Sequence, residues 1–285
     1  MKRPTFYLLN MAALAGSILL LPSCEKSNDQ PQSADIAVSA QDQSLAEDET
    51  AALADLTDAA APTDAAVPNS PAAESDDLTR LAGRCLTRTY DATTRTLILD
   101  FGLTNCMGPN GVARRGKIVT VFGGPLREAG ATKTIKLVDY YRNDNQHSGT
   151  RLITRLGSGS WSLLVQNASI TTPAGTHSWN ASRTYTRTAG EGTRTLTDDE
   201  YSVTGQAGGT NRKGVSYTAT IGQPLIKKFQ PGCARTFVAG TVSIVTDKDK
   251  QALLNYDPTG TQACDNIASI TVNGVTRTIR IGGGL

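Results

Sequence analysis

Near its C-terminus the chain reads Ile267-Ala-Ser-Ile-Thr-Val-Asn-Gly-Val-Thr-Arg-Thr-Ile-Arg-Ile281. Two runs rich in β-branched residues flank Asn273-Gly274, a dipeptide that tolerates the left-handed backbone of a two-residue hairpin turn. This stretch predicts two antiparallel strands joined by a tight turn. The same pattern governs most of the chain upstream of it.

From about Leu81, runs of Thr, Val, Ile and Tyr alternate with a period of two and are separated by Gly, Asn and Asp. They predict strands at 96–101, 117–122, 132–142, 151–156, 161–171, 177–187, 201–205, 215–221, 235–245, 267–272 and 275–281. No run of ten or more residues in this part has helical spacing. We therefore expect an all-β fold, an antiparallel meander of about ten to fourteen strands that forms a curved sheet, a barrel or a sandwich. Because aromatic residues make up only 5% of the chain, the core is expected to be thin, which favours a curved sheet or a wet-faced barrel.

The small net charge of +2 hides a division along the chain. Between Glu25 and Thr79 there are 13 acidic residues and one Lys, a net charge of −12. From Arg80 to the end, 25 Lys and Arg face 13 Asp and Glu, a net charge of +12. Opposite charge in two parts of one chain indicates two physical roles.

The acidic part lacks aromatic residues and the apolar density that offsets chain entropy, so residues 24–79 are expected to be a disordered tether. Its stretch 45–56 is rich in helix formers and predicts a short helix. A soluble spacer is the favoured role. Two other roles remain open, repulsion from an anionic membrane and shielding of the basic domain within the molecule. The basic part, residues 80–285, is expected to be the all-β domain.

The first residues predict a secretion signal. Lys2 and Arg3 precede an apolar stretch from Leu8 to Leu21 that is too short to cross a bilayer comfortably. The following Leu21-Pro-Ser-Cys24 resembles the lipobox of bacterial lipoproteins. That resemblance implies cleavage after residue 23 and attachment of the membrane lipid to Cys24. The alternative is an ordinary secretory signal whose cysteine lies near the cleavage point.

Four cysteines remain once Cys24 is assigned to the lipid, and an even number in an exported chain indicates two disulfides. Cys85 and Cys106 flank one predicted hairpin, and Cys233 and Cys264 flank another. We therefore predict the pairs Cys85–Cys106 and Cys233–Cys264, each contributing ~2–4 kcal/mol. A zinc or redox site is disfavoured, because the chain has no Cys-x-x-Cys spacing.

Several segments of the basic part, read together, are similar to a group of outer-membrane lipoproteins of the Bacteroidota. The similar segments are Leu99-Asp-Phe-Gly102, Cys106, Gly108, Arg115-Gly-Lys-Ile118, Asp139-Tyr-Tyr-Arg-Asn-Asp-Asn145, Gly149, Gly209-Thr-Asn-Arg-Lys-Gly214, Cys264-Asp-Asn266 and Thr271-Val-Asn-Gly274. The resemblance implies an all-β fold and a cell-envelope location. It implies no particular activity.

Catalytic patterns are sparse. The chain has two histidines, His147 and His177, each in a Thr/Ser-rich context typical of exposed strand ends, and no Gly-x-Ser-x-Gly motif. Asp198-Asp-Glu200 is the densest acidic cluster of the basic part and is typical of a solvated loop, although paired carboxylates also serve glycoside hydrolysis. Asn143-Asp-Asn145 has oxygen ligands of the kind that calcium binds, but the segment fits a tight turn better.

The net charge of +12 over residues 80–285 suggests one binding hypothesis. Seven cations are candidates for a patch that attracts anionic glycans or another polyanion of the envelope: Arg114, Arg115, Lys117, Arg212, Lys213, Lys227 and Lys228. An equal alternative is that these cations protect exposed strands from edge pairing. Nucleic acid is not an expected partner, because no aromatic residues interleave with the charges.

These observations favour a lipoprotein anchored in the outer membrane that acts without catalysis, as a binding or structural module for an anionic glycan or an envelope protein. No cofactor or metal is expected. The competing interpretation is a carbohydrate-active hydrolase that uses paired carboxylates.

Overall fold

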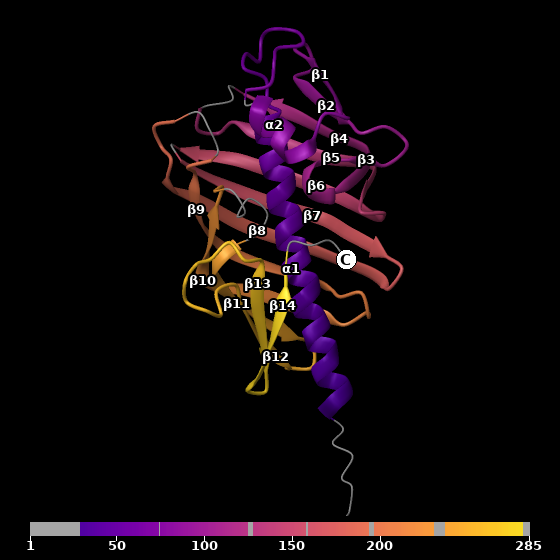
Figure 1. The fold of residues 1–285 in the computed structure, drawn as a ribbon, viewed down its shortest axis with the longest axis vertical. Helices are drawn as coiled ribbons and strands as arrows, with labels where there is room; N and C mark the ends of the chain where they lie inside the picture. Colours follow the sequence, from indigo (N-terminus) through magenta and orange to yellow (C-terminus); the bar gives the residue numbers. More distant parts are fainter. Residues whose placement is uncertain are drawn as a thin grey trace, which may run out of the picture.

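The all-β prediction is confirmed by the computed structural model, which describes residues 29–73, 75–124, 128–157, 159–193, 197–230 and 237–281. The strands form one 14-stranded antiparallel sheet in the order β1-β2-β4-β5-β6-β7-β8-β9-β10-β11-β12-β13-β14, with β3 paired to β4 (Figure 1). Nearly every strand pairs with its neighbours in sequence, as expected of a meander. The sheet is strongly curved and does not close into a barrel, so β1 and β14 remain its edges.

The strand bounds follow the predicted hairpins closely. The sheet comprises β1 (Thr87–Asp91), β2 (Thr96–Asp100), β3 (Cys106–Met107), β4 (Ala113–Gly123), β5 (Thr132–Arg142), β6 (Asn145–Gly157), β7 (Ser160–Thr172), β8 (Gly175–Ala189), β9 (Glu200–Thr210), β10 (Ser216–Lys228), β11 (Phe237–Thr246), β12 (Gln251–Asn255), β13 (Ile267–Val272) and β14 (Val275–Arg280). A short 3-10 helix, η1 (Pro109–Gly111), follows β3. The short strands β1, β3 and β12 were not among the eleven predicted ranges.

Two predicted turns are confirmed. Asn273 and Gly274 have φ of 50° and 77° and join β13 to β14, where Val272 pairs with Val275. Asn143 and Asp144 have φ of 49° and 62° and join β5 to β6. Both are two-residue turns with two left-handed positions, which match the twist of the flanking strands.

Irregular positions bend the long central strands. The register shifts between Arg115 and Lys117 in β4, and between Ser148 and Thr150 in β6. Gly149 has φ of 97°, and a Cβ there would lie 2.4 Å from the Cα of Ala168 on β7. Such bulges increase local twist and bend the strand, and here they help to give the sheet its curvature.

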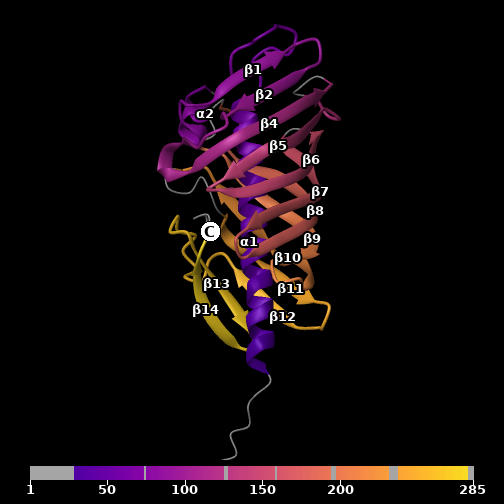
Figure 2. The same cartoon turned by 90° about the vertical axis from the view of Figure 1, so that its right-hand side faces the viewer.

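The hollow of the sheet holds a helix. Helix α1 (Asp29–Ala59) runs along the inner face, and β13 and β14 curl round to its other side (Figure 2). Between residues 35 and 59 only Gln41 and Asp58 are exposed, so α1 is buried on almost every side. Neither helix among the described residues combines the length and the apolar character that a membrane crossing requires.

The predicted disordered tether over residues 24–79 is therefore wrong for residues 29–59, which form the central element of the fold. The helix expected at 45–56 is present within α1 and extends beyond it on both sides. A second helix, α2 (Ser75–Ala82), precedes β1. Residues 24–28 lie outside the described residues. Residues 29–59 can be buried because their acidic side chains, which are typical of a solvated segment, are paired with cations from the sheet.

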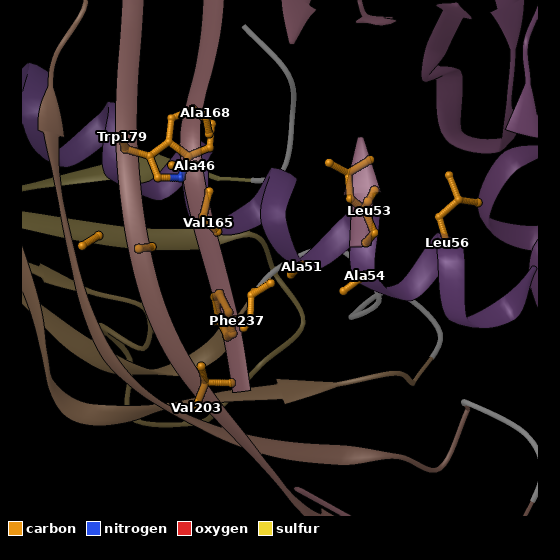
Figure 3. Packing of buried hydrophobic residues seen from close by; sticks show 14 of the residues in the cluster. Ala46, Ala51, Leu53, Ala54, Leu56, Val165, Ala168, Trp179, Val203 and Phe237 are labelled. Atoms are coloured by element: carbon orange, nitrogen blue, oxygen red, sulfur yellow. The ribbon is translucent and has the colours of Figure 1, made fainter. Parts of the chain in front are cut away.

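Apolar side chains of α1 and of the inner face of the sheet form one core. Figure 3 shows Leu53 and Leu56 of α1 in the same cluster as Val165, Trp179 and Phe237 of the sheet. Small residues, mostly alanines, fill much of the helix side of this core. Charged pairs between α1 and the sheet lie beside this apolar core.

Candidate functional site

The seven cations predicted to form one patch lie in two separate regions. Arg114, Arg115 and Lys117 belong to β4, whereas the other four lie in the β9–β10 turn and in β10: Arg212, Lys213, Lys227 and Lys228. Strands β5 to β9 separate the two groups in the sheet. The structure does not bring the seven side chains together.

Most of these cations are already neutralised. Six of the seven form an ion pair with a carboxylate: Arg115 with Asp144, Lys117 with Asp100 (2.9 Å), Arg212 with Asp42 (2.5 Å), Lys213 with Asp35 (3.7 Å), Lys227 with Asp55, and Lys228 with Glu200 (3.7 Å). Three of the six carboxylates belong to α1. A cation that is paired within the molecule attracts a free polyanion less strongly.

Among the described residues, the densest set of charged side chains lies between α1 and the inner face of the sheet. Acidic side chains of α1 reach Lys and Arg side chains on β5, β8, β10 and the β9–β10 turn, and the His147 ring on β6. The pairs are Asp58 with Lys133 (2.6 Å), Asp48 and Glu49 with Arg142 (3.2 and 2.8 Å), Glu49 with His147 (3.3 Å), Glu47 with Arg183, Asp42 with Arg212, and Asp55 with Lys227. We call this set the charged core.

Glu49 lies at the centre of the charged core. Arg142 donates to one of its oxygens at 2.8 Å, and Nδ1 of His147 lies 3.3 Å from the other. Burial raises the pKa of Glu49, but His147 and Arg142 outweigh burial and hold that pKa well below its usual range. Glu49 therefore remains a carboxylate while fully enclosed in protein.

A chain of hydrogen bonds links three elements, β8, β10 and α1. Nε2 of His177 on β8 lies 2.7 Å from the Tyr217 hydroxyl on β10, which donates to Gln43 at 3.1 Å. Gln43 donates in turn to Glu47 at 2.5 Å, and Glu47 accepts from Arg183. Because the Tyr217 hydroxyl donates to Gln43, we infer that His177 donates to Tyr217. Burial and the nearby charge of Arg212 lower the pKa of His177 to about 3, so the ring is neutral at pH 7.

Burial raises the pKa of three other carboxylates of α1. Burial raises the pKa of Asp55 to about 6, although Lys227 donates to that carboxylate and opposes the rise. The pKa values of Asp42 and Asp48 are also raised by burial. The charged core thus combines one carboxylate whose pKa is lowered, Glu49, with three whose pKa is raised by burial.

Two of the four buried arginines, Arg114 and Arg151, have no carboxylate in hydrogen-bond contact among the described residues. Arg151 is fully buried, donates to the carbonyls of Ser148 and Gly149, and has two unused donor nitrogens. Arg114 is 7% exposed and also has two unused nitrogens. Next to Arg114, Glu49 and Arg142 lies a cavity of ≈ 10 Å³, which suits about one water molecule.

A larger hollow of ≈ 370 Å³ lies on the opposite, outer face of the sheet, over β7 to β10. Its lining side chains are uncharged and come from Leu164, Asn180, Ala181, Ser182, Gln206, Ala207, Gly208, Thr218 and Thr220. Among these, only Leu164 has a large apolar side chain, and it is 40% exposed. The outer hollow is therefore a shallow site rich in amide and hydroxyl groups.

The residues considered for catalysis are placed differently from the prediction. His147 and His177 are 5% and 2% exposed on the inner face, so the expectation of exposed strand ends is wrong for both. Asp199 is 3% exposed rather than solvated, accepts from the Tyr201 hydroxyl at 2.6 Å and pairs with Arg187 at 3.1 Å. Within the described part of the chain, no cluster of His, Cys, Asp and Glu suits a metal ion.

The disulfide prediction is confirmed for Cys85–Cys106, whose Cα atoms are 5.8 Å apart. Cys264 also belongs to a disulfide. Cys233, like Cys24, lies outside the described residues, so the Cys233–Cys264 pair and the lipid attachment at Cys24 stay predictions.

Sequence reasoning missed the cations that matter most for the fold. Lys133, Arg142, Arg151 and Arg183 occupy inward positions of strands, where an alternating pattern predicts apolar side chains. The signal that pointed to them was the opposite charge of the two parts of the chain. Of the roles considered for the acidic segment, shielding of the basic domain is the one that these pairs support.

Comparison with protein families, with curated proteins and with solved structures finds no match. The resemblance to outer-membrane lipoproteins of the Bacteroidota therefore stays a prediction.

Proposed function

We propose that this chain is a lipoprotein of the bacterial outer membrane, anchored through Cys24, and that its β domain is a non-enzymatic binding or structural module held close to the membrane. The observation that carries this proposal is the position of α1. It begins at Asp29, five residues after Cys24, and forms the ion-paired centre of the sheet. Force applied at the lipid anchor would therefore be transmitted through α1 to the core of the domain.

The geometry supports a short distance to the membrane and a definite orientation. Five residues span at most about 18 Å at ~3.6 Å each. Near the start of α1, Asn211 in the β9–β10 turn donates to the carbonyl of Asp35 at 3.2 Å. At its end, Arg88 on β1 donates to the carbonyl of Ala60 at 2.8 Å. The β9–β10 turn would therefore face the membrane, and β1 would lie about 46 Å away along a 31-residue helix.

A polyanion is not needed as the partner in this proposal. Six of the seven candidate cations are paired with carboxylates, which weakens their attraction for anionic glycans. Enzymatic function has little support for a similar reason. The buried histidines and Asp199 are engaged in structural contacts, and no acidic side chain among the described residues lines the outer hollow.

The anchor is tested by labelling cells with an alkynyl fatty acid and sequencing the N-terminus of the mature protein by mass spectrometry. We expect an acylated N-terminal Cys24 and loss of both label and membrane attachment in Cys24→Ser. The matched control Cys85→Ser should keep the label. An unmodified mature chain that begins elsewhere would refute the anchor.

The orientation is tested separately by fluorophores placed on two exposed turns, with Lys248→Cys in the β11–β12 turn and Thr94→Cys in the β1–β2 turn. The first turn lies beside the β9–β10 connection, where Asp247 donates to the Ser216 carbonyl at 3.1 Å. A quencher attached to lipid headgroups should dim the fluorophore at position 248 more strongly. Equal quenching at both positions would contradict the proposed orientation.

A further inference from the structure

The outer hollow is uncharged, and the described outward positions around it on β7 to β10, such as Ser178, Thr184 and Thr204, are uncharged as well. Asn180, Ser182, Gln206, Thr218 and Thr220 project from three adjacent strands, and no charged side chain lines the hollow among the described residues. They alternate along each strand with buried side chains such as Trp179 and Tyr217, which places them on the face away from α1. In a chain with 19% charged residues, a strongly solvated face would be expected to carry Lys, Arg or Glu.

The pairing register gathers these side chains into two neighbouring rows. Asn180 on β8 lies opposite Gly208 on β9, which lies opposite Thr218 on β10. One row further, Ser182 lies opposite Gln206, and Gln206 opposite Thr220. Gly208 therefore forms the floor, with hydrogen-bonding groups on either side.

The backbone does not require a glycine at position 208. A Cβ there would meet only the Tyr217 carbonyl oxygen at 3.4 Å, an ordinary contact, and its φ is not in the left-handed region. The adjacent Gly209 is different, because a Cβ would lie 2.1 Å from the Ser178 carbonyl oxygen. Glycine inside a strand is unfavourable relative to alanine and often marks a place where a ligand approaches the backbone.

We propose that the outer hollow is a binding site for a neutral saccharide, which lies over Gly208 and exchanges hydrogen bonds with Asn180, Gln206 and Thr218. Amide and hydroxyl groups both donate and accept, which matches the hydroxyl groups of a sugar. The exposed side chain of Leu164 offers an apolar surface to the C–H face of a ring. A volume of ≈ 370 Å³ lies within the range of about 300–1,000 Å³ that is usual for ligand sites.

Other ligand classes fit this site less well. An anionic glycan would find no cation among the described lining residues, and a nucleobase would find no aromatic ring on which to stack. A strongly apolar ligand would cover hydroxyl and amide groups without satisfying them, which carries a desolvation penalty. The inference goes beyond the proposed function and does not depend on the anchor at Cys24.

The test uses the mature chain with Cys24→Ser, so that it is free of lipid, and a panel of neutral hexasaccharides of glucose, mannose and galactose. Binding is followed by calorimetry and by amide chemical shifts of β8, β9 and β10. We expect saturable binding of at least one member that does not weaken with added salt. Gly208→Thr should fill the floor of the hollow with a strand-forming residue and weaken binding by at least about tenfold.

Gly157→Thr is the matched control, because Gly157 also lies in a strand, has no left-handed φ and has open space around it. It should leave binding unchanged. Urea unfolding of Gly208→Thr should show stability equal to or above that of the parent chain, which separates lost binding from lost folding. Binding by no member of the panel, or equal binding by Gly208→Thr, would overturn the proposal. So would tighter binding of a heparin hexasaccharide than of every neutral one.

Discussion

At the scale of single residues, the molecule depends on charged side chains that are removed from water. Burying an unpaired charge is strongly unfavourable, whereas a buried pair is usually no more stabilising than apolar side chains of similar size. The pairs of the charged core therefore contribute little net stability but fix which side chain lies opposite which. Two predictions concern individual members of this set.

The first prediction concerns His177, which packs against Trp179 and Tyr217 with Arg212 nearby. Burial and the charge of Arg212 lower its pKa from 6.5 to about 3. As the pH falls below 6.5, the unfolded chain takes up a proton that the folded chain refuses, so the free energy of unfolding decreases. Between pH 7 and pH 5 this loss should be about 2 kcal/mol. Urea unfolding at both pH values should show a smaller loss for His177→Gln, and an identical loss would contradict the assignment.

The second prediction concerns Lys227 and Asp55, which are 2% and 8% exposed. Lys227→Met leaves Asp55 buried without its cation and should cost about 3–5 kcal/mol at pH 7. Because burial raises the pKa of Asp55 to about 6, the cost should shrink at pH 5, where that carboxyl is largely protonated. The double variant Lys227→Met/Asp55→Leu should recover most of the stability. Additive losses in a double-mutant cycle at pH 7 would show that the pair is not coupled.

At the scale of elements, the hairpins and part of the helix could be predicted, but the full length and the burial of α1 could not. The β13–β14 hairpin is specified by adjacent residues, since Asn273-Gly274 and its β-branched flanks lie within one short stretch. The environment of α1 is specified by residues far away in sequence. Glu49 and Arg142 are 93 positions apart, and Asp55 and Lys227 are 172 apart. Local composition therefore indicated a solvated segment where long-range pairing produces a buried one.

The bulges are the elements that curve the sheet around α1, and Gly149 provides the third prediction. Ala at this position combines φ of 97° with a Cβ 2.4 Å from the Cα of Ala168 on the next strand. Gly214→Ala is the control, because Gly214 has φ of 82° but open space around it. The control should cost about 1–2 kcal/mol from backbone strain alone. Thermal or urea unfolding should show a larger loss for Gly149→Ala, and equal losses would mean that β7 moves aside easily.

At the scale of the whole molecule, the division of charge along the chain determines how the fold is assembled, because the two oppositely charged parts pack together. The acidic segment and the basic domain carry equal and opposite charges in the sequence, and the structure places α1 of the acidic segment inside the curved sheet. Among the elements that the structure describes, α1 fills the concave face of the open sheet (Figure 2). A domain boundary at residue 80, which composition suggested, consequently cuts through the core rather than between domains.

The last prediction follows from that boundary. A fragment of residues 80–285 retains every strand but loses the partners of Lys133, Arg142, Arg183 and Lys227. We expect it to lack the cooperative urea transition and the near-ultraviolet circular dichroism of the mature chain, because buried cations without counter-charges destabilise a folded sheet. A synthetic peptide of residues 29–60 should restore both signals when mixed with the fragment. The same peptide with Glu47→Gln and Glu49→Gln keeps its helix-forming character but should restore them weakly, since it cannot neutralise Arg183 and Arg142. If the fragment unfolds cooperatively with the same free energy of unfolding as the mature chain, α1 does not contribute to the stability of the sheet.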